Sequence, residues 1–175
     1  MSLRIAYRMR QLWQALGFHA ESIDARTLEE YLNPEQRELF QSMPAAEQRH
    51  SLATLRTLQA KGHFEQALLQ AALLHDAGKA GGRVRLWHRV ATVLLRSLAP
   101  ALLVPLARNE PGTWRYPFFV QLHHAERGAA LAAEAGTHAL AVALIRWHHS
   151  APHESALGPQ AQELLTWLQA ADGQN

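Results

Sequence analysis

The chain has no cysteine among its 175 residues, so it forms neither disulfide bonds nor zinc sites with thiolate ligands. This absence fits a reducing compartment, and we expect a cytoplasmic protein. The N-terminal MSLRIAYRMRQLW has arginines where a signal peptide would have a continuous apolar run, so we expect no secretory signal there. The most hydrophobic stretch, residues 90–107, is interrupted by Arg96, Pro100 and Pro105 and is a poor membrane span.

Charge is also scarce, because only 18% of the residues are charged and the net charge is +2. With 48% hydrophobic residues, the composition excludes a disordered chain and suits one domain that buries roughly 70% of its unfolded surface. The small net charge indicates no binding to a nucleic-acid duplex. Basic side chains do gather in one stretch, at Lys79, Arg83, Arg85, His88 and Arg89. They form either a solvated loop or a rim that attracts anions.

Helical periodicity runs through nearly the whole chain, and no segment alternates polar and apolar residues as a strand would. Residues 3–16 place their apolar side chains on one face before Gly17, which predicts an amphipathic helix packed on the core. Further helices are expected over 27–42 (with a second one starting at Pro34), 44–61, 64–76, 84–99, 101–107, 121–135, 138–149 and 159–171, with a loop at 109–117. The sequence therefore predicts one all-α domain over 1–175.

The run LLHDAGK at residues 73–79 places a histidine and an aspartate at the end of an almost wholly apolar helix. A carboxylate beside an imidazole is costly to bury unless something pairs with it. A divalent metal is a suitable partner, because neutral imidazole and carboxylate oxygens are both good ligands. His75 and Asp76 therefore mark a candidate metal site.

Other histidines and a second aspartate lie on apolar helical faces or beside small residues. A single buried histidine is more often a hydrogen-bonded core residue than a ligand. Two buried carboxylates change this balance, because they are rarely tolerated unpaired. Together these residues predict one shared metal centre, made of His50, His75, Asp76, His124, His148 or its neighbour His149, and Asp172.

The order H…HD…H…H…D, with LLHDAGK around the doublet, resembles the HD superfamily of metal-dependent phosphohydrolases. HHAERGAALAAEAG at 123–136 is similar to the HPExGAxL segment of the HD-GYP and related branches, and IRWHHS at 145–150 resembles their IRxHHE segment. The resemblance covers residues 43–172. It implies a helical bundle of the HD-domain type, on which helices from residues 1–42 would pack.

The resemblance also implies two divalent ions bridged by Asp76. The other ligands would divide between the ions, with His50, His75 and Asp172 on the first, and His124 with His148 or His149 on the second. Lys79 matches the lysine of the family's HDxGK motif and would stabilise negative charge on a substrate phosphate. Nitrogen and oxygen ligands suit iron, manganese, nickel, cobalt or zinc.

Two departures from the family narrow the prediction. The chain reads HHSAPHESALGP where HD-GYP proteins continue into a GYP signature, and this puts cyclic di-GMP in doubt as the substrate. Trinuclear members carry a glutamate four residues before the first histidine, where this chain has Ala46. The sequence therefore predicts two ions rather than three.

The expected activity is hydrolysis of a phosphomonoester, phosphodiester or nucleotide by a metal-activated water, with Asp76 and Lys79 as catalytic groups. Arg83, Arg85 and Arg89 would hold phosphate oxygens. Three alternatives stay open at this stage: oxygenation at a di-iron centre, a non-catalytic domain that senses a ligand or docks on a partner, and weak association of residues 87–106 with a membrane or a partner helix. The aromatic run at 114–116 either lines the pocket or packs on the next helix. The oligomeric state is not predicted.

Overall fold

The computed structural model describes residues 25–175, and the amphipathic helix predicted over 3–16 lies outside the described residues. The described residues form helices and loops without a strand, which confirms the all-α prediction. The α-helices, in chain order, are α2 (Ala25–Tyr31), α3 (Pro34–Ser42), α4 (Ala45–Ala60), α5 (Gln66–Leu74), α6 (Leu86–Leu98), α7 (Pro100–Leu106), α8 (Tyr116–Glu134), α9 (Ala139–Trp147) and α10 (Pro159–Asp172). Two 3₁₀ helices, η1 (Ala77–Lys79) and η2 (Pro152–Glu154), follow α5 and α9.

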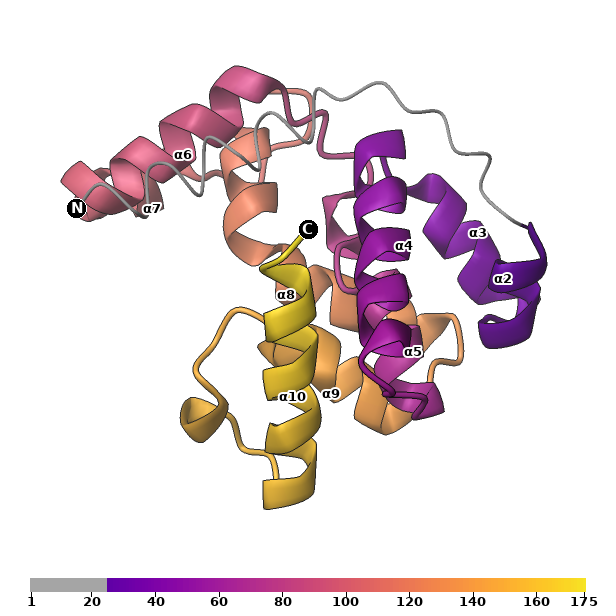
Figure 1. Ribbon diagram of the computed structural model, residues 1–175. Coiled ribbons are helices and arrows are strands. Elements are labelled where there is room, and N and C mark those ends of the chain that lie inside the picture. The colour runs from indigo at the N-terminus through magenta and orange to yellow at the C-terminus, as the bar shows by residue number, and fades with distance from the viewer. Residues whose placement is uncertain (1–24) are drawn as a thin grey trace.

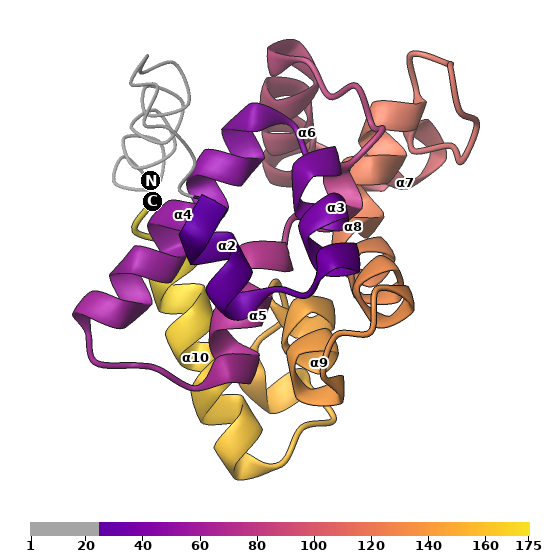
Figure 2. The ribbon, with the colours of Figure 1, turned by 90° about the vertical axis from the view of Figure 1, so that its right-hand side faces the viewer.

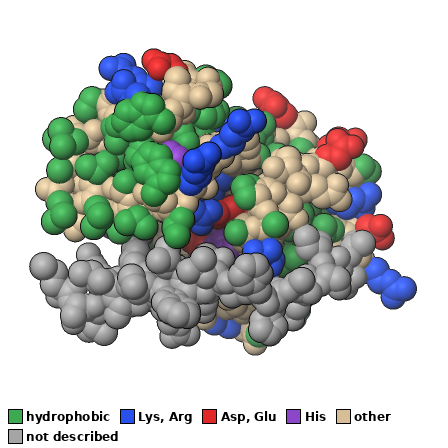
Figure 3. Space-filling view, turned by 90° about the horizontal axis from the view of Figure 1, so that it is seen from above, with side chains coloured by type: hydrophobic (Ala, Val, Ile, Leu, Met, Phe, Trp, Pro, Cys, Tyr) green, Lys and Arg blue, Asp and Glu red, His purple; other side chains and the backbone are tan. Residues whose placement is uncertain are grey.

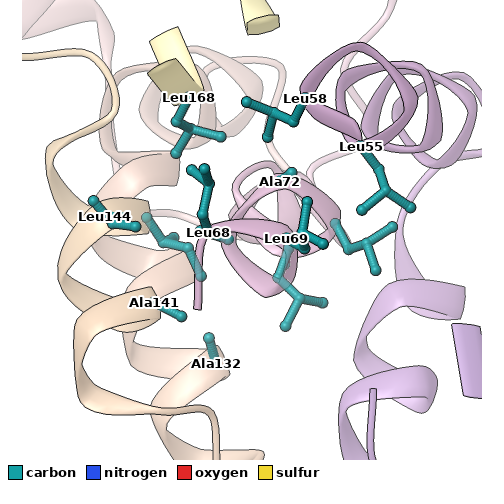
Figure 4. Close-up of a cluster of buried hydrophobic side chains, with 14 of the residues drawn as sticks. Leu55, Leu58, Leu68, Leu69, Ala72, Ala132, Ala141, Leu144 and Leu168 are labelled. Atoms are coloured by element: carbon teal, nitrogen blue, oxygen red, sulfur yellow. The ribbon is translucent and has the colours of Figure 1, made fainter. Parts of the chain in front are cut away.

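Helix α5 is the centre of the fold, because it is apolar all round and therefore needs neighbours on every side. All of its residues from Leu68 to Leu74 are buried. Helices α4, α9 and α10 contact it from different sides (Figures 1 and 2). Leucines and alanines of these helices meet around it, as the labelled side chains in Figure 4 show. This arrangement carries the end of α5, and the His-Asp doublet after it, into the interior.

The start of α3 follows the sequence prediction, with Pro34 in its first turn. Asn33 caps the helix, and its side chain and that of Gln36 form a reciprocal capping box. The same two residues tie this part of the chain to the loop after α8: Asn33 Nδ2 donates to the Ala135 carbonyl at 3.1 Å, and Gln36 Nε2 donates to Thr137 Oγ1 at 3.2 Å. The segment 25–42 is thus packed on the helices that follow it.

Among the boundaries that differ from the prediction, two lie near His75 and His124, in the helices predicted over 64–76 and 121–135. Helix α5 ends at Leu74, so His75 is its C-terminal cap and Asp76 lies in the turn before η1. Helix α8 begins at Tyr116, inside the segment predicted as a loop. The reason is Pro117, which occupies the first turn, where its missing N–H costs no helical hydrogen bond.

The 3₁₀ helix η1 lies unusually close to α8, and two glycines make this approach feasible. A side chain at Gly78 would place its Cβ 1.9 Å from the His124 carbonyl oxygen and 2.6 Å from the Gly128 nitrogen. At Gly128, the same atom would lie 3.0 Å from the Gly78 nitrogen. The close contact brings Asp76 beside the part of α8 that carries His124.

Helices α6 and α7 form a pair that projects to one side of the molecule and contacts α8 (Figure 1). Pro100 separates them, as the sequence predicts. Among the described residues, no helix combines the length and the apolarity needed to cross a bilayer.

Candidate metal centre

The structure gathers all seven predicted ligands in one region, from five different helices. They come from the middle of α4 and α8 and from the C-terminal ends of α5, α9 and α10: His50, His124, His75, Asp76, His148, His149 and Asp172. Six of these residues form two groups, and within each group the potential ligand atoms lie within 4.8 Å of one another. One group is His50, His75 and Asp76, and the other is His124, His148 and His149. Neither grouping is apparent from the distances along the chain.

The first group is joined by Asp172. Its Oδ1 lies 2.6 Å from His50 Nε2 and 3.4 Å from His75 Nε2. His75 Nε2 is also 3.5 Å from Asp76 Oδ2. His75 and Asp76 are almost completely buried, whereas His50 and Asp172 are each about one fifth exposed. This half of the centre therefore has two nitrogen donors, two carboxylates and a route to solvent.

The second group consists of three imidazoles. His124 Nε2 and His149 Nε2 lie 2.8 Å apart, and the ring of His148 is 4.0 Å from that of His149 and 5.3 Å from that of His124. His124 and His148 are buried and His149 is exposed. The sequence left His148 and His149 as alternatives, but the structure places both in this group.

Asp76 lies between the two groups and presents one oxygen to each. Its Oδ2 faces His75, at 3.5 Å from that residue's Nε2, and its Oδ1 lies 3.5 Å from His124 Nε2. The carboxylate has this position because the chain turns at the end of α5 while η1 packs on α8. An aspartate placed in this way is suited to hold two cations at once.

Backbone carbonyls orient three of the imidazoles. The Nδ1 atoms of His75, His124 and His148 lie 3.0, 2.9 and 2.6 Å from the carbonyl oxygens three residues earlier in the chain. A carbonyl only accepts hydrogen bonds, so each Nδ1 carries a ring proton, and each Nε2 offers a lone pair whenever its ring is neutral. Metal-binding histidines are commonly oriented in this way.

Two of those Nε2 atoms have no hydrogen-bond partner among the described residues. Both His75 Nε2 and His148 Nε2 are buried and unsatisfied. A buried polar atom without a partner costs about 1–3 kcal/mol, and a metal ion would satisfy both nitrogens. The donor set and these orphaned atoms therefore fit a divalent metal.

The charges of the metal-free site follow from burial and neighbours. Burial lowers the pKa of His75, but Asp76 and Asp172 outweigh this effect and raise it to about 9. Burial, together with Lys79, lowers the pKa of His124 to about 3, and burial also lowers that of His148. Without metal at neutral pH, His75 is thus protonated between two carboxylates, while the second group offers neutral imidazoles.

Lys79 belongs to a charged network at the edge of the centre. Its Nζ lies 2.7 Å from Asp76 Oδ2 and 2.9 Å from Glu47 Oε2. Burial lowers the pKa of Lys79, but these two carboxylates outweigh it and keep the ammonium charged. The other Glu47 oxygen pairs with Arg89. Lys79 therefore sits beside the ligands with about a fifth of its side chain exposed.

Glu47 is a residue of this network that the sequence analysis did not single out. It is 3% exposed, although glutamate is rarely buried without a partner. It precedes His50 by three residues, a spacing that places two side chains on the same face of a helix. That spacing was the available signal.

The predicted phosphate-binding arginines take different positions. Arg89 reaches the centre through its ion pair with Glu47. Arg83 and Arg85 are both exposed, and Arg85 lines an apolar groove on the outer face of α6. No contact given by the structure brings Arg83 or Arg85 to the seven ligands.

The aromatic run before α8 packs on nearby elements. Trp114 is 61% exposed and its ring meets Phe118 edge-on. Arg115 donates to the carbonyl of Leu106 at 3.2 Å, and Tyr116 stacks on Phe119. These contacts favour the interpretation that the run packs on α7 and α8 over the interpretation that it lines the site.

Comparison of this chain with protein-family models, with curated proteins and with solved structures finds no match.

Proposed function

We propose that the seven clustered side chains bind two divalent metal ions and that the protein hydrolyses a phosphate ester at this centre. The observation that carries the proposal is the position of Asp76, which presents one oxygen to each of two ligand groups. The unsatisfied Nε2 atoms of His75 and His148, one in each group, support a pair of ions over one.

The chemistry of the donors suits iron, manganese, nickel, cobalt or zinc, since the ligands are imidazole nitrogens and carboxylate oxygens without sulfur. Two bound ions would lower the pKa of a water molecule and neutralise charge on a phosphate group. His75 must lose its proton before it can act as a ligand, because its pKa is about 9 in the metal-free site.

The remaining residues act on the substrate and on the ligands. Lys79 provides a fixed positive charge beside Asp76, suited to a phosphate oxygen that gains charge in the transition state. Glu47 holds Lys79 in place, and Arg89 balances the second Glu47 oxygen. The basic stretch from Lys79 to Arg89 would attract a phosphorylated substrate to this side of the centre.

Metal analysis of the full chain, purified without chelators, tests the first part of the proposal. We expect about two ions per chain in the parent protein, with both lost from Asp76→Ala. His124→Gln should lose one ion. His123→Gln is its matched control, because His123 is the preceding residue, is 40% exposed and has its ring against Phe119.

Activity assays on protein loaded with each metal in turn test the second part. The substrates are p-nitrophenyl phosphate, its diester and a panel of nucleotides. Hydrolysis should require metal, fall by at least about a hundredfold in Asp76→Ala and persist in His123→Gln. A chain that binds no metal, or an Asp76→Ala variant that retains both metal and activity, overturns the assignment. Oxygen consumption by the iron-loaded protein, without hydrolysis of any substrate, also contradicts it.

A further inference from the structure

Helix α6 has the reverse of the usual orientation, since it buries polar side chains and exposes apolar ones. Its buried residues are His88 and Thr92. Its exposed large apolar residues are Leu86, Trp87, Val90, Val93, Leu94 and Leu98. A helix at the surface of a water-soluble protein normally turns its apolar stripe to the core.

Local contacts keep α6 in this orientation. The backbone N–H of Arg85 donates to His88 Nδ1 at 3.0 Å, which ties the start of the helix to an inward-facing ring. That ring stacks on Trp87 and meets Phe118 of α8 edge-on. Burial lowers the pKa of His88 and so keeps its ring neutral. The outward apolar face is therefore built into the packing of the helix on α8.

The apolar surface continues onto α7. Of the ten large apolar side chains that are exposed in the described residues, eight belong to these two helices, including Leu102 and Val104 of α7. In the space-filling view, apolar side chains gather over one side of the molecule (Figure 3). We call this surface the α6–α7 face. Contiguous exposed apolar surface on a soluble protein commonly marks a binding site.

The chain segment that forms the α6–α7 face carries charge of a single sign. From residue 77 to residue 109 the sequence contains no aspartate or glutamate. The exposed basic residues of this stretch are Arg83, Arg85, Arg96 and Arg108, whereas Lys79 and Arg89 pair with Glu47 beside the metal centre. An anionic partner is therefore complementary to it.

This charge argues against two other occupants. A second copy of the chain would bring the same basic stretch against itself. The chain's own first 24 residues carry Arg4, Arg8 and Arg10 and no acidic residue before Glu21, so their charge has the same sign as that of the face. Like charges across an interface are unfavourable.

We propose that the α6–α7 face docks on an anionic lipid surface. Leucine, valine and tryptophan side chains enter the boundary between headgroups and acyl chains, while arginines contact the lipid phosphates. At 13 and 7 residues, α6 and α7 are too short to cross the roughly 30 Å of hydrocarbon, but they suit a position in the plane of the interface. This inference does not depend on the proposed hydrolase activity.

Co-sedimentation of the full chain with lipid vesicles tests the proposal. The vesicles are pure phosphatidylcholine or a mixture with phosphatidylglycerol, at about 0.05 M and about 0.5 M NaCl. The test variant is Leu94→Gln/Leu98→Gln, in which both side chains are more than half exposed. The control is Phe64→Gln, because Phe64 is 64% exposed but lies in the loop between α4 and α5. Circular dichroism checks that both variants are folded.

We expect the parent chain to sediment with anionic vesicles at low salt, and binding to fall by about tenfold at high salt or on neutral vesicles. Binding of the double variant to anionic vesicles at low salt should also be about tenfold weaker than that of the parent, and Phe64→Gln should bind as well as the parent. Equal binding by the folded double variant and the parent overturns the proposal. It is also overturned if the parent fails to bind anionic vesicles but binds poly-glutamate, which indicates an acidic protein partner. A dimer in solution that the double variant dissociates assigns the face to a second copy instead.

Discussion

Replacing Gly78 by alanine tests the close approach of η1 and α8 on which the proposed centre depends. The added Cβ would lie 1.9 Å from the His124 carbonyl oxygen, whereas ordinary van der Waals contacts of a Cβ atom begin at 3.4 Å. Both nearby atoms belong to the backbone of α8, so no side-chain rotation relieves the overlap. One of the two elements must move by more than about 1 Å, and for this overpacking we expect a loss of about 3 kcal/mol in unfolding free energy.

Two other glycines provide a graded comparison. Alanine at Gly128 places its Cβ 3.0 Å from the Gly78 nitrogen, an overlap of a few tenths of an ångström. Because alanine also favours the helix by about 0.5–1 kcal/mol, we expect Gly128→Ala to change stability by less than about 1 kcal/mol. Gly158 has open space around it and a φ of −68°. Its replacement by alanine should have an effect below about 0.5 kcal/mol.

Urea unfolding followed by circular dichroism measures these differences, and we would carry it out in the presence of a chelator so that metal binding does not contribute. A metal titration of the same variants gives a second measurement. Since displacement of η1 moves Asp76 away from His124, Gly78→Ala should also weaken metal binding by at least about tenfold. If Gly78→Ala is as stable as Gly158→Ala and binds metal normally, the packing of η1 on α8 described above is incorrect.

Two further predictions concern charge. Glu47→Gln removes the carboxylate that pairs with Lys79 and Arg89, so we expect the free energy of unfolding in urea to fall by about 2 kcal/mol. The control Glu126→Gln, at a carboxylate that is 75% exposed, should change stability little. Equal effects of the two substitutions would refute a structural role for Glu47. The metal-free protein should lose stability as the pH falls below 6.5, because unfolded histidine takes up a proton there while His124 stays neutral down to about pH 3. For His124 the loss between pH 6.5 and pH 5 is about 1.5 kcal/mol. His75 opposes this loss of stability little, because the stability that comes from its raised pKa develops between pH 9 and 6.5. His124→Gln should therefore flatten the dependence of unfolding free energy on pH below 6.5.

Much of the secondary structure could be predicted from the sequence because hydrophobic periodicity and capping residues act locally. The start of α3 after Asn33 follows from a capping box and a proline within four residues of one another. The central place of α5 follows from its lack of a polar face. The wrong prediction for the start of α8 has a local cause as well. Pro117 was interpreted as part of a loop, although proline is compatible with the first turn of a helix.

The candidate ligands could also be predicted, since their chemistry belongs to the residue type. Histidine and aspartate bind divalent metals wherever they meet, and a buried His-Asp doublet requires a partner. The sequence alone thus determined the helical class and predicted seven candidate ligands, six of which lie in two groups that could hold a metal ion. Their division into two groups is a property of helix packing, because it depends on which ends of α5, α9 and α10 converge.

The family resemblance already predicted a bridging position for Asp76, but only the tertiary structure paired Glu47 with Lys79 and turned the apolar side of α6 outward. Periodicity shows that a helix has two unlike faces, but the choice of the face that is buried depends on neighbours distant in the chain. For α6, the inward-facing ring of His88 and its contact with Phe118 of α8 decide that choice. The sequence determined which side chains are available, and packing between distant helices determined which of them meet.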